Sequence, residues 1–314
     1  MPQPNHQQLS KEFQPSFYLK KTSATKNSEI TFIDLFAGIG GFHAALKNLK
    51  AKCVFAAEID KEARKTYELN HYKNSAEMFD LKNFAHDITK INPHEIPDFD
   101  LLCAGFPCQP FSQAGFKKGF EEARGTLFFN IVNIIKIKKP QAFFLENVRH
   151  LLNHQNGETF ATIKKILEQD LGYKFYHKIV KASDFNLPQH RARLFMVGFK
   201  NQNIDFQFPK PLPLTTTMSD IWGESCAKKI GYTLRVGGRG SKIDDRRNWD
   251  SYLVGKNIKR ISVKEGKKMM GFDEDFIFPV SETQAMKQLG NSVAVPAIQA
   301  TAQKIIEALR NERN

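Results

Sequence analysis

The chain has few cysteines and no long apolar run, and each absence excludes a class of protein. No Cys-x-x-Cys pair occurs, so neither a zinc site nor a disulfide framework is indicated by the four cysteines, Cys53, Cys103, Cys108 and Cys226. No apolar stretch approaches the roughly 18 residues of a membrane span. The first residues, MPQPNHQQLSKEF, have no apolar segment of the kind found in a secretory signal. We therefore expect a reduced, intracellular protein with no metal and no membrane contact.

The chain also has fewer acidic than basic residues. The 314 residues include 33 Asp and Glu against 46 Lys and Arg, a net charge of +13. Such an excess favours a polyanionic partner, DNA or RNA, because neutralising phosphates releases counterions. Many basic intracellular proteins bind no nucleic acid specifically, so charge alone leaves that alternative open. The 41% hydrophobic and 25% charged residues are typical of a globular chain long enough for one large and one smaller domain.

Apolar runs alternate with helical patterns from residue 29 to about residue 200. Strands are expected over 29–36, 53–60, 99–105, 141–147, 175–183 and 193–199, with 189–193 also read as extended. Helices are expected over 42–51, 61–71, 131–139 and 158–172. Alternating elements of this length predict an α/β fold with a doubly wound sheet.

The alternation stops at the segment FQFPKPLPL, residues 206–214, where three prolines at alternate positions exclude a helix or a central strand. We place a domain boundary there. The expected parts are an N-terminal arm (1–28), a large α/β domain (29–207 plus 279–314) and a small, irregular, Gly- and Arg-rich module (208–278). Residues 281–310 read as one or two helices with a Gly-Asn break.

The first glycine-rich segment, Asp34 to Gly41, reads DLFAGIGG. A glycine turn between a strand and a helix lets a ligand approach the backbone closely. Glu58 ends the next strand, where a carboxylate can accept hydrogen bonds from both ribose hydroxyls. Asp87 stands where a third strand would end, in reach of an adenine amino group, and Phe36 could stack on the adenine. These features fit a nicotinamide enzyme nearly as well as a methyltransferase. A tight turn with only a structural role is a further alternative.

The second segment, GFPCQPFS, spans residues 105–112. An apolar strand ends there in a rigid Pro-Cys-Gln-Pro turn. Ligands in open α/β sheets bind outside the carboxyl ends of strands, so Cys108 would face the cleft. A thiol is a good nucleophile once its pKa is lowered. A lone cysteine is otherwise a small buried hydrophobe, and Cys103, inside the apolar run, fits that interpretation.

Two later segments carry charged side chains at strand ends. Glu146 ends the strand QAFFLEN. Near Cys108 its pKa would be raised by desolvation, so it could share a proton with a ring nitrogen of a base. In the segment QHRAR, alternation along a strand puts Gln189, Arg191 and Arg193 on one face. Two such arginines need an anion or a carbonyl, which a substrate or a salt bridge within the fold could provide.

Taken in order, these segments resemble the motif set of the DNA (cytosine-5) methyltransferase family. The set comprises DLFAGIGG, Glu58, GFPCQPFS, ENV, QHRAR and QLGNSVAVPA, and it covers about residues 30–200 and 260–300. The chain size is similar to that of compact bacterial restriction–modification enzymes. The resemblance implies a Rossmann-like methyltransferase sheet with a smaller DNA-recognition domain, S-adenosylmethionine as methyl donor and S-adenosylhomocysteine as product. It also implies base flipping in double-stranded DNA by a cytoplasmic, bacterial monomer that could have a cognate restriction endonuclease.

The resemblance assigns roles residue by residue. Cys108 would attack carbon 6 of cytosine, Glu146 would hold ring nitrogen 3, and Arg193 the carbonyl, with Arg191 helping on the same face. The implied cofactor site consists of Phe36, Ala37, Gly38, Ile39, Gly40, Gly41, Glu58, Ile59, Asp87, Ile88, Gly105, Pro107, Asn291, Ser292 and Val293. The implied DNA contacts are Gln109, Ser112, Arg124, Arg239, Arg246 and Arg247.

Three other functions compete with this one. A branch of the same family modifies RNA, but arginines of the Gly- and Arg-rich insert could pair with guanine edges in the major groove, which favours duplex DNA. A DNA-binding regulator with a decayed site would not need Cys108, Glu146 and Arg193 intact. A nicotinamide oxidoreductase leaves PCQP, ENV and QHRAR unexplained. One departure from the family stands out: residues 264–273 resemble its penultimate motif but have lysines where arginines are usual, which puts the packing of the recognition domain in question.

Overall fold

A computed structural model describes residues 29–107 and 126–313 of the chain. A seven-stranded sheet with the order β3-β2-β1-β4-β5-β7-β6 forms its centre. The strands are β1 (Thr31–Leu35), β2 (Lys52–Ala57), β3 (Phe84–Ala85), β4 (Leu101–Gly105), β5 (Ala142–Val148), β6 (Lys174–Lys181) and β7 (Ala192–Phe199). β7 runs antiparallel to both neighbours, and the other pairings are parallel. The predicted doubly wound α/β sheet is confirmed.

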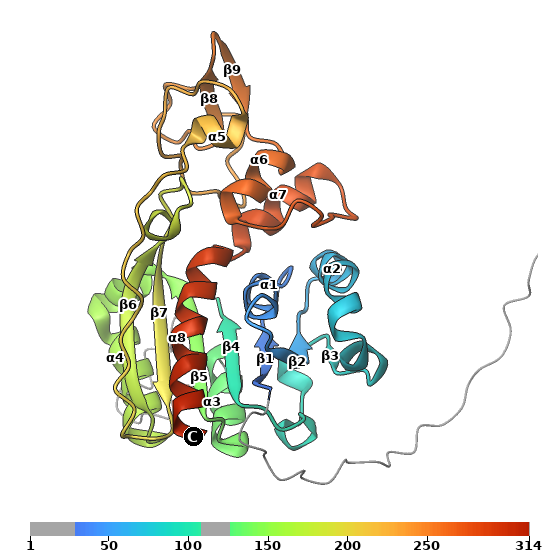
Figure 1. Cartoon of the computed structure of the whole chain (residues 1–314), viewed down its shortest axis with the longest axis vertical. Helices are drawn as coiled ribbons and strands as arrows, with labels where there is room; N and C mark the ends of the chain where they lie inside the picture. Colours follow the sequence, from blue (N-terminus) through green and yellow to red (C-terminus); the bar gives the residue numbers. More distant parts are fainter. Residues whose placement is uncertain (1–28, 108–125, 314) are drawn as a thin grey trace, which may run out of the picture.

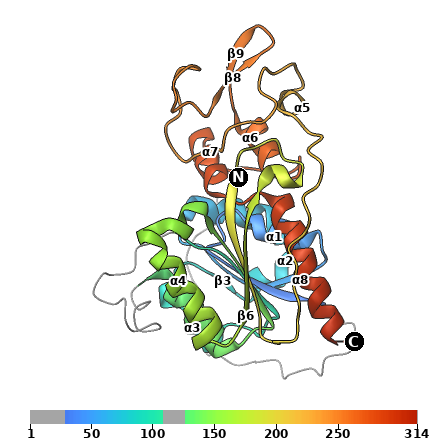
Figure 2. The same ribbon diagram turned by 90° about the vertical axis from the view of Figure 1, so that its left-hand side faces the viewer.

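Helices cover both faces of this sheet (Figures 1 and 2). Their bounds are α1 (Gly41–Lys47), α2 (Lys61–Asp80), α3 (Leu127–Lys138), α4 (Glu158–Lys165), α5 (Met218–Trp222), α6 (Val263–Met270), α7 (Glu282–Asn291) and α8 (Val295–Arg313). Alternate residues of β1 face opposite layers: Phe32 packs with α1, α2 and α8, whereas Ile33 packs with α3 and α4. Because both faces are covered, the central strands are mostly apolar; the buried polar exceptions are Asp34 of β1 and Glu146 and Asn147 of β5.

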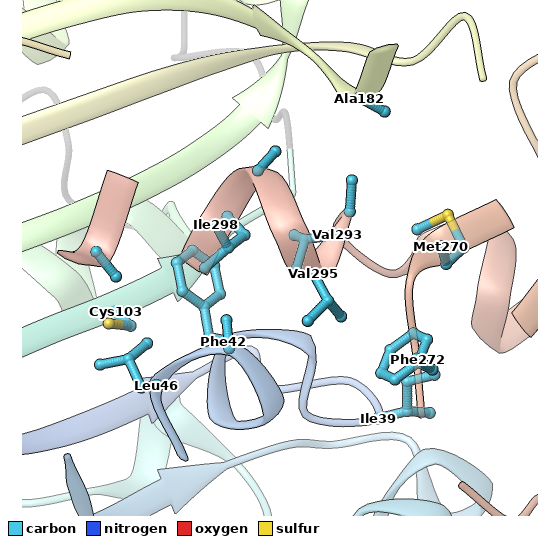
Figure 3. Close-up of a cluster of buried hydrophobic side chains, with 14 of the residues drawn as sticks. Ile39, Phe42, Leu46, Cys103, Ala182, Met270, Phe272, Val293, Val295 and Ile298 are labelled. Atoms are coloured by element: carbon cyan, nitrogen blue, oxygen red, sulfur yellow. The ribbon is translucent and has the colours of Figure 1, made fainter. Parts of the chain in front are cut away.

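The glycine-rich loop and the start of α8 are packed together by one apolar cluster (Figure 3). Phe42 on α1 lies against Ile298 on α8, and Val293 and Val295 lie between the two helices. Cys103 of β4 belongs to the same buried cluster. This packing brings the C-terminal motif, 250 residues away in sequence, against the first one.

Three elements differ from the sequence prediction. The helix expected over 61–71 continues to Asp80 with a kink at Ser75, and Met78 in its last part is buried in the core. The helix expected over 158–172 ends at Lys165 and continues as a π-helical turn, Ile166–Asp170. The extended segment expected from residue 189 joins the sheet only at Ala192, because Gln189 is held elsewhere by bonds to Met269 O and Leu234 N (2.9 and 3.1 Å).

Residues 208–278 are called the distal segment below. Its first residues run along the sheet beside β6, and from α5 onward the segment lies beyond the carboxyl ends of the parallel strands (Figures 1 and 2). Residues 206–217 have no helix or strand, as the alternating prolines predicted. The segment then contains α5, the hairpin of β8 (Ser251–Val254) and β9 (Asn257–Arg260), and α6. Its boundaries as a separate domain stay a prediction.

The motif with lysines in place of arginines is well packed. Ser262 and Glu265 form a capping box at the start of α6, and Gly271 ends the helix in a left-handed conformation. The ammonium of Lys267 donates to the carbonyls of Glu274 and Phe276, so a lysine ties down the turn that follows. No helix in the part of the chain described here is long and apolar enough to cross a membrane.

Candidate active site

A pocket of about 650 Å³ opens at the carboxyl ends of β1, β2, β4 and β5. Fourteen of the fifteen residues expected to bind the cofactor line it: Phe36, Ala37, Gly38, Ile39, Gly41, Glu58, Ile59, Asp87, Ile88, Gly105, Pro107, Asn291, Ser292 and Val293. Glu146, Arg191 and Arg193 line the same pocket. Segments spread over more than 250 residues of sequence are therefore brought to one cavity.

The glycine-rich loop forms the floor of this pocket in a conformation that favours glycine. Gly38 and Gly40 have φ of +56° and +84°, and Phe36 has φ of +54°. A Cβ at Gly38 would meet no atom within 4 Å, so the space above it is open to a ligand. Gly40 is the one predicted residue that does not line the pocket, because it faces the protein: a Cβ there would lie 2.1 Å from Nε2 of His71.

Glu58 is held by the loop that it faces. Its Oε2 accepts a hydrogen bond from Gly38 N (2.8 Å) and its Oε1 one from Asp60 N (2.7 Å). Burial raises the pKa of this carboxyl, and the two backbone N–H groups oppose that shift. Asp60 in turn caps α2 through Glu62 N and Ala63 N, which fixes the end of β2 relative to the helix. Ile59, 71% exposed, forms an apolar rim beside Glu58.

Asp87 follows β3 and caps a short 3-10 turn. Its Oδ1 accepts from Thr89 N (2.9 Å) and from the Thr89 hydroxyl (2.7 Å), and these bonds lower the pKa of Asp87. The bonds to Thr89 favour the ionised carboxylate and fix its position, and Asp87 lines the pocket. Such a group suits an amino-group donor.

Glu146 and Arg193 form an ion pair in the wall of the pocket. Oε1 of Glu146 lies 3.0 Å from Nε of Arg193, and both side chains are largely buried. Burial raises the pKa of Glu146, and the charges of Arg193 and Arg191 partly oppose this. The desolvation predicted for Glu146 is therefore present, and its role in carrying a proton to a ring nitrogen stays a prediction.

Arg191 is directed into the protein backbone rather than toward open pocket space. Its guanidinium donates to Leu234 O (3.2 Å) and Gly290 O (3.0 Å), and also to Ser292 O. Burial, followed by the charge of Arg193, lowers the pKa of Arg191 to about 9. The two arginines predicted to share a face therefore have different partners. Arg191 connects three backbone segments, whereas Arg193 pairs with Glu146.

The predicted nucleophile, Cys108, and the predicted DNA contacts Gln109, Ser112 and Arg124 lie outside the described residues. The chain enters that segment through Pro107, which lines the pocket. Asn147 holds the entry: its buried amide donates to Phe106 O (3.0 Å) and its Oδ1 accepts from Val148 N (2.8 Å). Cys103 is buried in β4 with a pKa well above the ordinary value because of that burial, which excludes it as the nucleophile.

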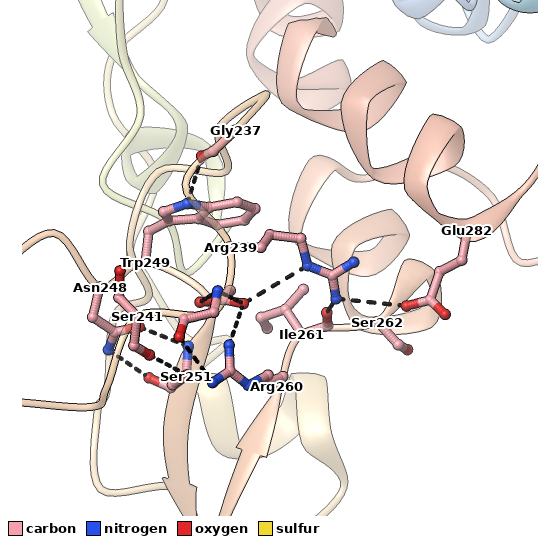
Figure 4. Close-up of polar contacts among 12 residues, drawn as sticks. Gly237, Arg239, Ser241, Asn248, Trp249, Ser251, Arg260, Ile261, Ser262 and Glu282 are labelled. Carbon is pink, nitrogen blue, oxygen red and sulfur yellow. Dashed lines mark hydrogen bonds and ion pairs between the residues drawn. The ribbon is translucent and has the colours of Figure 1, made fainter.

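Two of the three arginines expected to read DNA are engaged within the protein. Arg239 lies between the distal hairpin and Glu282 of α7 (Figure 4), with Nε 3.7 Å from Asp250 and Nη2 3.5 Å from Glu282. Arg247 pairs with Asp245 at 2.8 Å. Arg246 has neither a hydrogen bond nor an ion pair within the described ranges.

Sequence reasoning missed some residues of this site. Asn147 belongs to the ENV motif, and the sequence predicted no role for it, although its position directly after Glu146 was a usable signal. Gln288 lines the pocket, is 7% exposed, and has an Nε2 with no hydrogen-bond partner in the described part of the chain. Its Oε1 accepts from the Thr66 hydroxyl (2.9 Å). Nothing local in the sequence marks this contact across 222 residues.

The chain also matches a known protein family. The family model described as C-5 cytosine-specific DNA methylase matches residues 30–237 and 236–307. The Type II methyltransferase M.NlaX of Neisseria lactamica is 41% identical, over 88% of this chain and 96% of its own length. The Type II methyltransferase M.HpaII of Haemophilus parainfluenzae is 39% identical, over 95% of both chains.

Among solved structures, the S. pombe Dnmt2 methyltransferase superposes with a TM-score of 0.68. The alignment covers 90% of this chain and 99% of that one, at 20% sequence identity. At this identity the likeness shows the shared fold alone.

Proposed function

The chain belongs to the C-5 cytosine-specific DNA methylase family and is a DNA (cytosine-5) methyltransferase, and on that premise we propose how it works. It transfers the methyl group of S-adenosylmethionine to carbon 5 of a cytosine in a short, specific sequence of duplex DNA. The target base is flipped out and attacked by Cys108. Methylation protects host DNA from a cognate restriction endonuclease. The observation that carries this proposal is the Glu146–Arg193 ion pair in the same pocket as Glu58 and the glycine-rich loop.

The pocket residues fit an adenosyl cofactor with a charged amino-acid tail. Gly38 leaves open space above the backbone, and Glu58 offers carboxylate oxygens at the end of β2 for ribose hydroxyls. Asp87 offers an acceptor for the adenine amino group, next to the apolar side chains of Ile59 and Ile88. Gln288, whose Nε2 has no partner among the described residues, lines the same pocket and offers a further donor. When bound, S-adenosylmethionine supplies an electrophilic methyl group.

The protein side chains make carbon 5 of cytosine reactive. The Cys108 thiolate adds to carbon 6 and forms a C–S bond, while the electron pair of the ring double bond moves toward nitrogen 3. Glu146 places its proton at nitrogen 3, and Arg193 holds the carbonyl oxygen. Carbon 5 is then nucleophilic and takes the methyl group as the methyl–sulfur bond of the donor breaks, which leaves S-adenosylhomocysteine. Loss of the carbon 5 proton to a base reforms the ring double bond between carbons 5 and 6 and breaks the C–S bond, which frees Cys108, and the nitrogen 3 proton returns to Glu146.

Base flipping is needed because carbon 6 is inaccessible inside the duplex. It costs a few kcal/mol, which phosphate contacts must offset. The net charge of +13 is consistent with such contacts. The wall occupied by Glu146 and Arg193 then receives the extruded base.

Methylation sequencing of plasmid DNA from cells expressing the protein tests the activity. Modified cytosines confined to one short motif are expected and would give the recognition sequence as well. If no cytosine is modified by a folded protein that binds S-adenosylmethionine, duplex DNA is the wrong substrate and RNA becomes the next one to test.

Trapping on DNA with 5-fluorocytosine at the mapped target tests the nucleophile, because fluorine cannot leave as the proton does. The wild type and Cys103→Ser should form a covalent complex, and Cys108→Ser should form none. Cys103→Ser is the matched control, since that thiol is buried in β4. Equal trapping by Cys108→Ser would exclude Cys108 as the nucleophile.

A further inference from the structure

A basic surface lies beside the catalytic wall and is not part of the site described so far. Two adjoining hollows of about 510 and 360 Å³ share Arg149 and Arg193, and the second also includes Lys181 and His190. Arg193 lines these two hollows and the active-site pocket as well. We call Arg149, Lys181 and His190 the basic strip; Arg193 is the side chain between the strip and the reacting base.

Strand register brings the strip together from three separate segments. β5 and β7 pair Val148 with Arg193, so Arg149 follows at the end of that pairing. β6 and β7 pair Lys181 with Ala192, directly before Arg193. His190 precedes β7, and its backbone is held by Gly231 O (2.9 Å). The strip therefore sits on rigid strand ends at the edge of the sheet that faces the distal segment (Figure 1).

Within the described residues, no side chain forms an ion pair with the strip, although the carboxylate of Asp184 accepts a hydrogen bond from the backbone N–H of Lys181 (3.2 Å). Arg149, Lys181 and His190 are exposed, and their own side chains form no hydrogen bond or ion pair there. No carboxylate is among the described residues lining either hollow. Neighbouring cations without a counter-charge repel one another, and binding an anion relieves that repulsion. The carboxylate of the adjacent Glu146 is already paired with Arg193.

We propose that the basic strip binds the phosphodiester next to the target cytosine on the strand that is methylated. The inference rests on the proposed function. A cytosine inserted against Glu146 has Arg193 at its edge, so the phosphate joined to the same nucleotide lies on the outer side of that wall. Arg149 offers a bidentate fork to phosphate oxygens and Lys181 a point charge. This contact helps offset the cost of flipping the base.

Salt dependence of DNA binding tests the strip in the double variant Arg149→Gln/Lys181→Gln. Each lost phosphate contact should reduce the slope of log K against log salt by about 0.9, which corresponds to about fivefold in affinity at roughly 0.15 M salt. The control is Lys178→Gln/Arg310→Gln, which removes the same charge. Lys178 lies on β6 three residues before Lys181 and so on the other face, and Arg310 is exposed on α8. The control should keep the wild-type slope.

Neutral methylphosphonate linkages then locate the contact, once the target site has been mapped. One linkage beside the target cytosine should weaken wild-type binding about fivefold and weaken the double variant no further. The proposal is overturned if the double variant keeps the wild-type salt slope, or if it still responds to both neighbouring linkages as the wild type does. Either result leaves methylation by the wild type, and therefore the proposed function, intact. A wild type that methylates no cytosine would overturn both.

Discussion

Arginine is used differently in the catalytic pocket and in the distal segment. In the pocket, Arg191 is buried and its two terminal nitrogens donate to three backbone carbonyls, and Arg193 is paired with the buried Glu146. In the distal segment the buried partner is the acid: Asp250 is inaccessible, while Arg239 and Arg260, which lie 3.7 and 3.3 Å from it, are 33% and 46% exposed.

The difference shows what each region can do with its charge. A buried arginine fixed by the backbone cannot move toward a ligand, so it defines the shape of a site. An arginine that forms an ion pair with a buried acid keeps part of its guanidinium at the surface, where it can contact phosphate or a base edge. Arg191 therefore fixes the shape of the pocket, whereas Arg239 and Arg260, anchored by Asp250, present positive charge at the surface of the distal segment.

The largest effect is expected at Glu146, where the pocket does chemistry. Glu146→Gln keeps the shape but removes the proton for ring nitrogen 3. We expect the single-turnover methylation rate to fall by about 10²–10⁴-fold, the usual contribution of general acid–base catalysis. Binding of S-adenosylmethionine, measured by calorimetry, should stay within about threefold of the wild type. A rate within tenfold of the wild type would exclude the proton-donating role.

Arg191→Lys tests whether the bonds from the buried Arg191 to backbone carbonyls stabilise the fold. One ammonium cannot reach three carbonyls that a planar guanidinium reaches together, so buried acceptors lose their donors. We expect the free energy of unfolding in urea to fall by about 3 kcal/mol. Arg310→Lys, at an exposed position of α8, should change it by less than about 0.5 kcal/mol. A loss below about 1 kcal/mol for Arg191→Lys would show that the three bonds are not required.

The stability of the pocket floor should depend on pH through His71. Nε2 of His71 lies 3.2 Å from Ile39 O, and burial lowers the pKa of His71 to about 4 from an ordinary 6.5. The unfolded chain then binds more protons than the folded one between these values, so stability falls as pH drops from about 6.5 to 4. His71→Gln should reduce that loss by about 3 kcal/mol. An unchanged pH dependence of unfolding would mean that His71 is not the titrating group.

Asp250→Asn tests the opposite arrangement in the distal segment. It leaves Arg239 and Arg260 without the buried acid beneath them. Because both arginines are partly exposed, water replaces part of the lost pairing, and we expect a loss of about 2 kcal/mol rather than the larger cost of a fully buried pair. Methylation at saturating DNA should stay within a few-fold, since the pocket is untouched. A rate loss as large as that of Glu146→Gln would contradict the separation of the two regions.

The parts that the sequence predicted well are those that local pattern determines. β4 and β5 are buried on both faces, so their apolar runs identified them, and motifs at their carboxyl ends had to meet at one edge. The partners of Arg191 lie 43, 99 and 101 residues away, and no spacing rule predicts such contacts. The late start of β7 has the same origin, because Gln189 is held by residues 45 and 80 positions distant.

Two adjacent arginines of the distal segment, Arg246 and Arg247, test the smallest expected difference, that between an unpaired and a paired arginine. Arg247 bonds both oxygens of Asp245 (3.1 and 2.8 Å), and this pairing lowers the pKa of Asp245 to about 2. Arg246 is exposed and has no such partner in the described part of the chain. Arg246→Gln should weaken DNA binding about fivefold at roughly 0.15 M salt. Asp245→Asn/Arg247→Gln changes no net charge and should stay within about twofold. A tenfold loss in that double variant would show instead that Arg247 leaves Asp245 to read a base, since a bidentate base contact contributes about 1–3 kcal/mol.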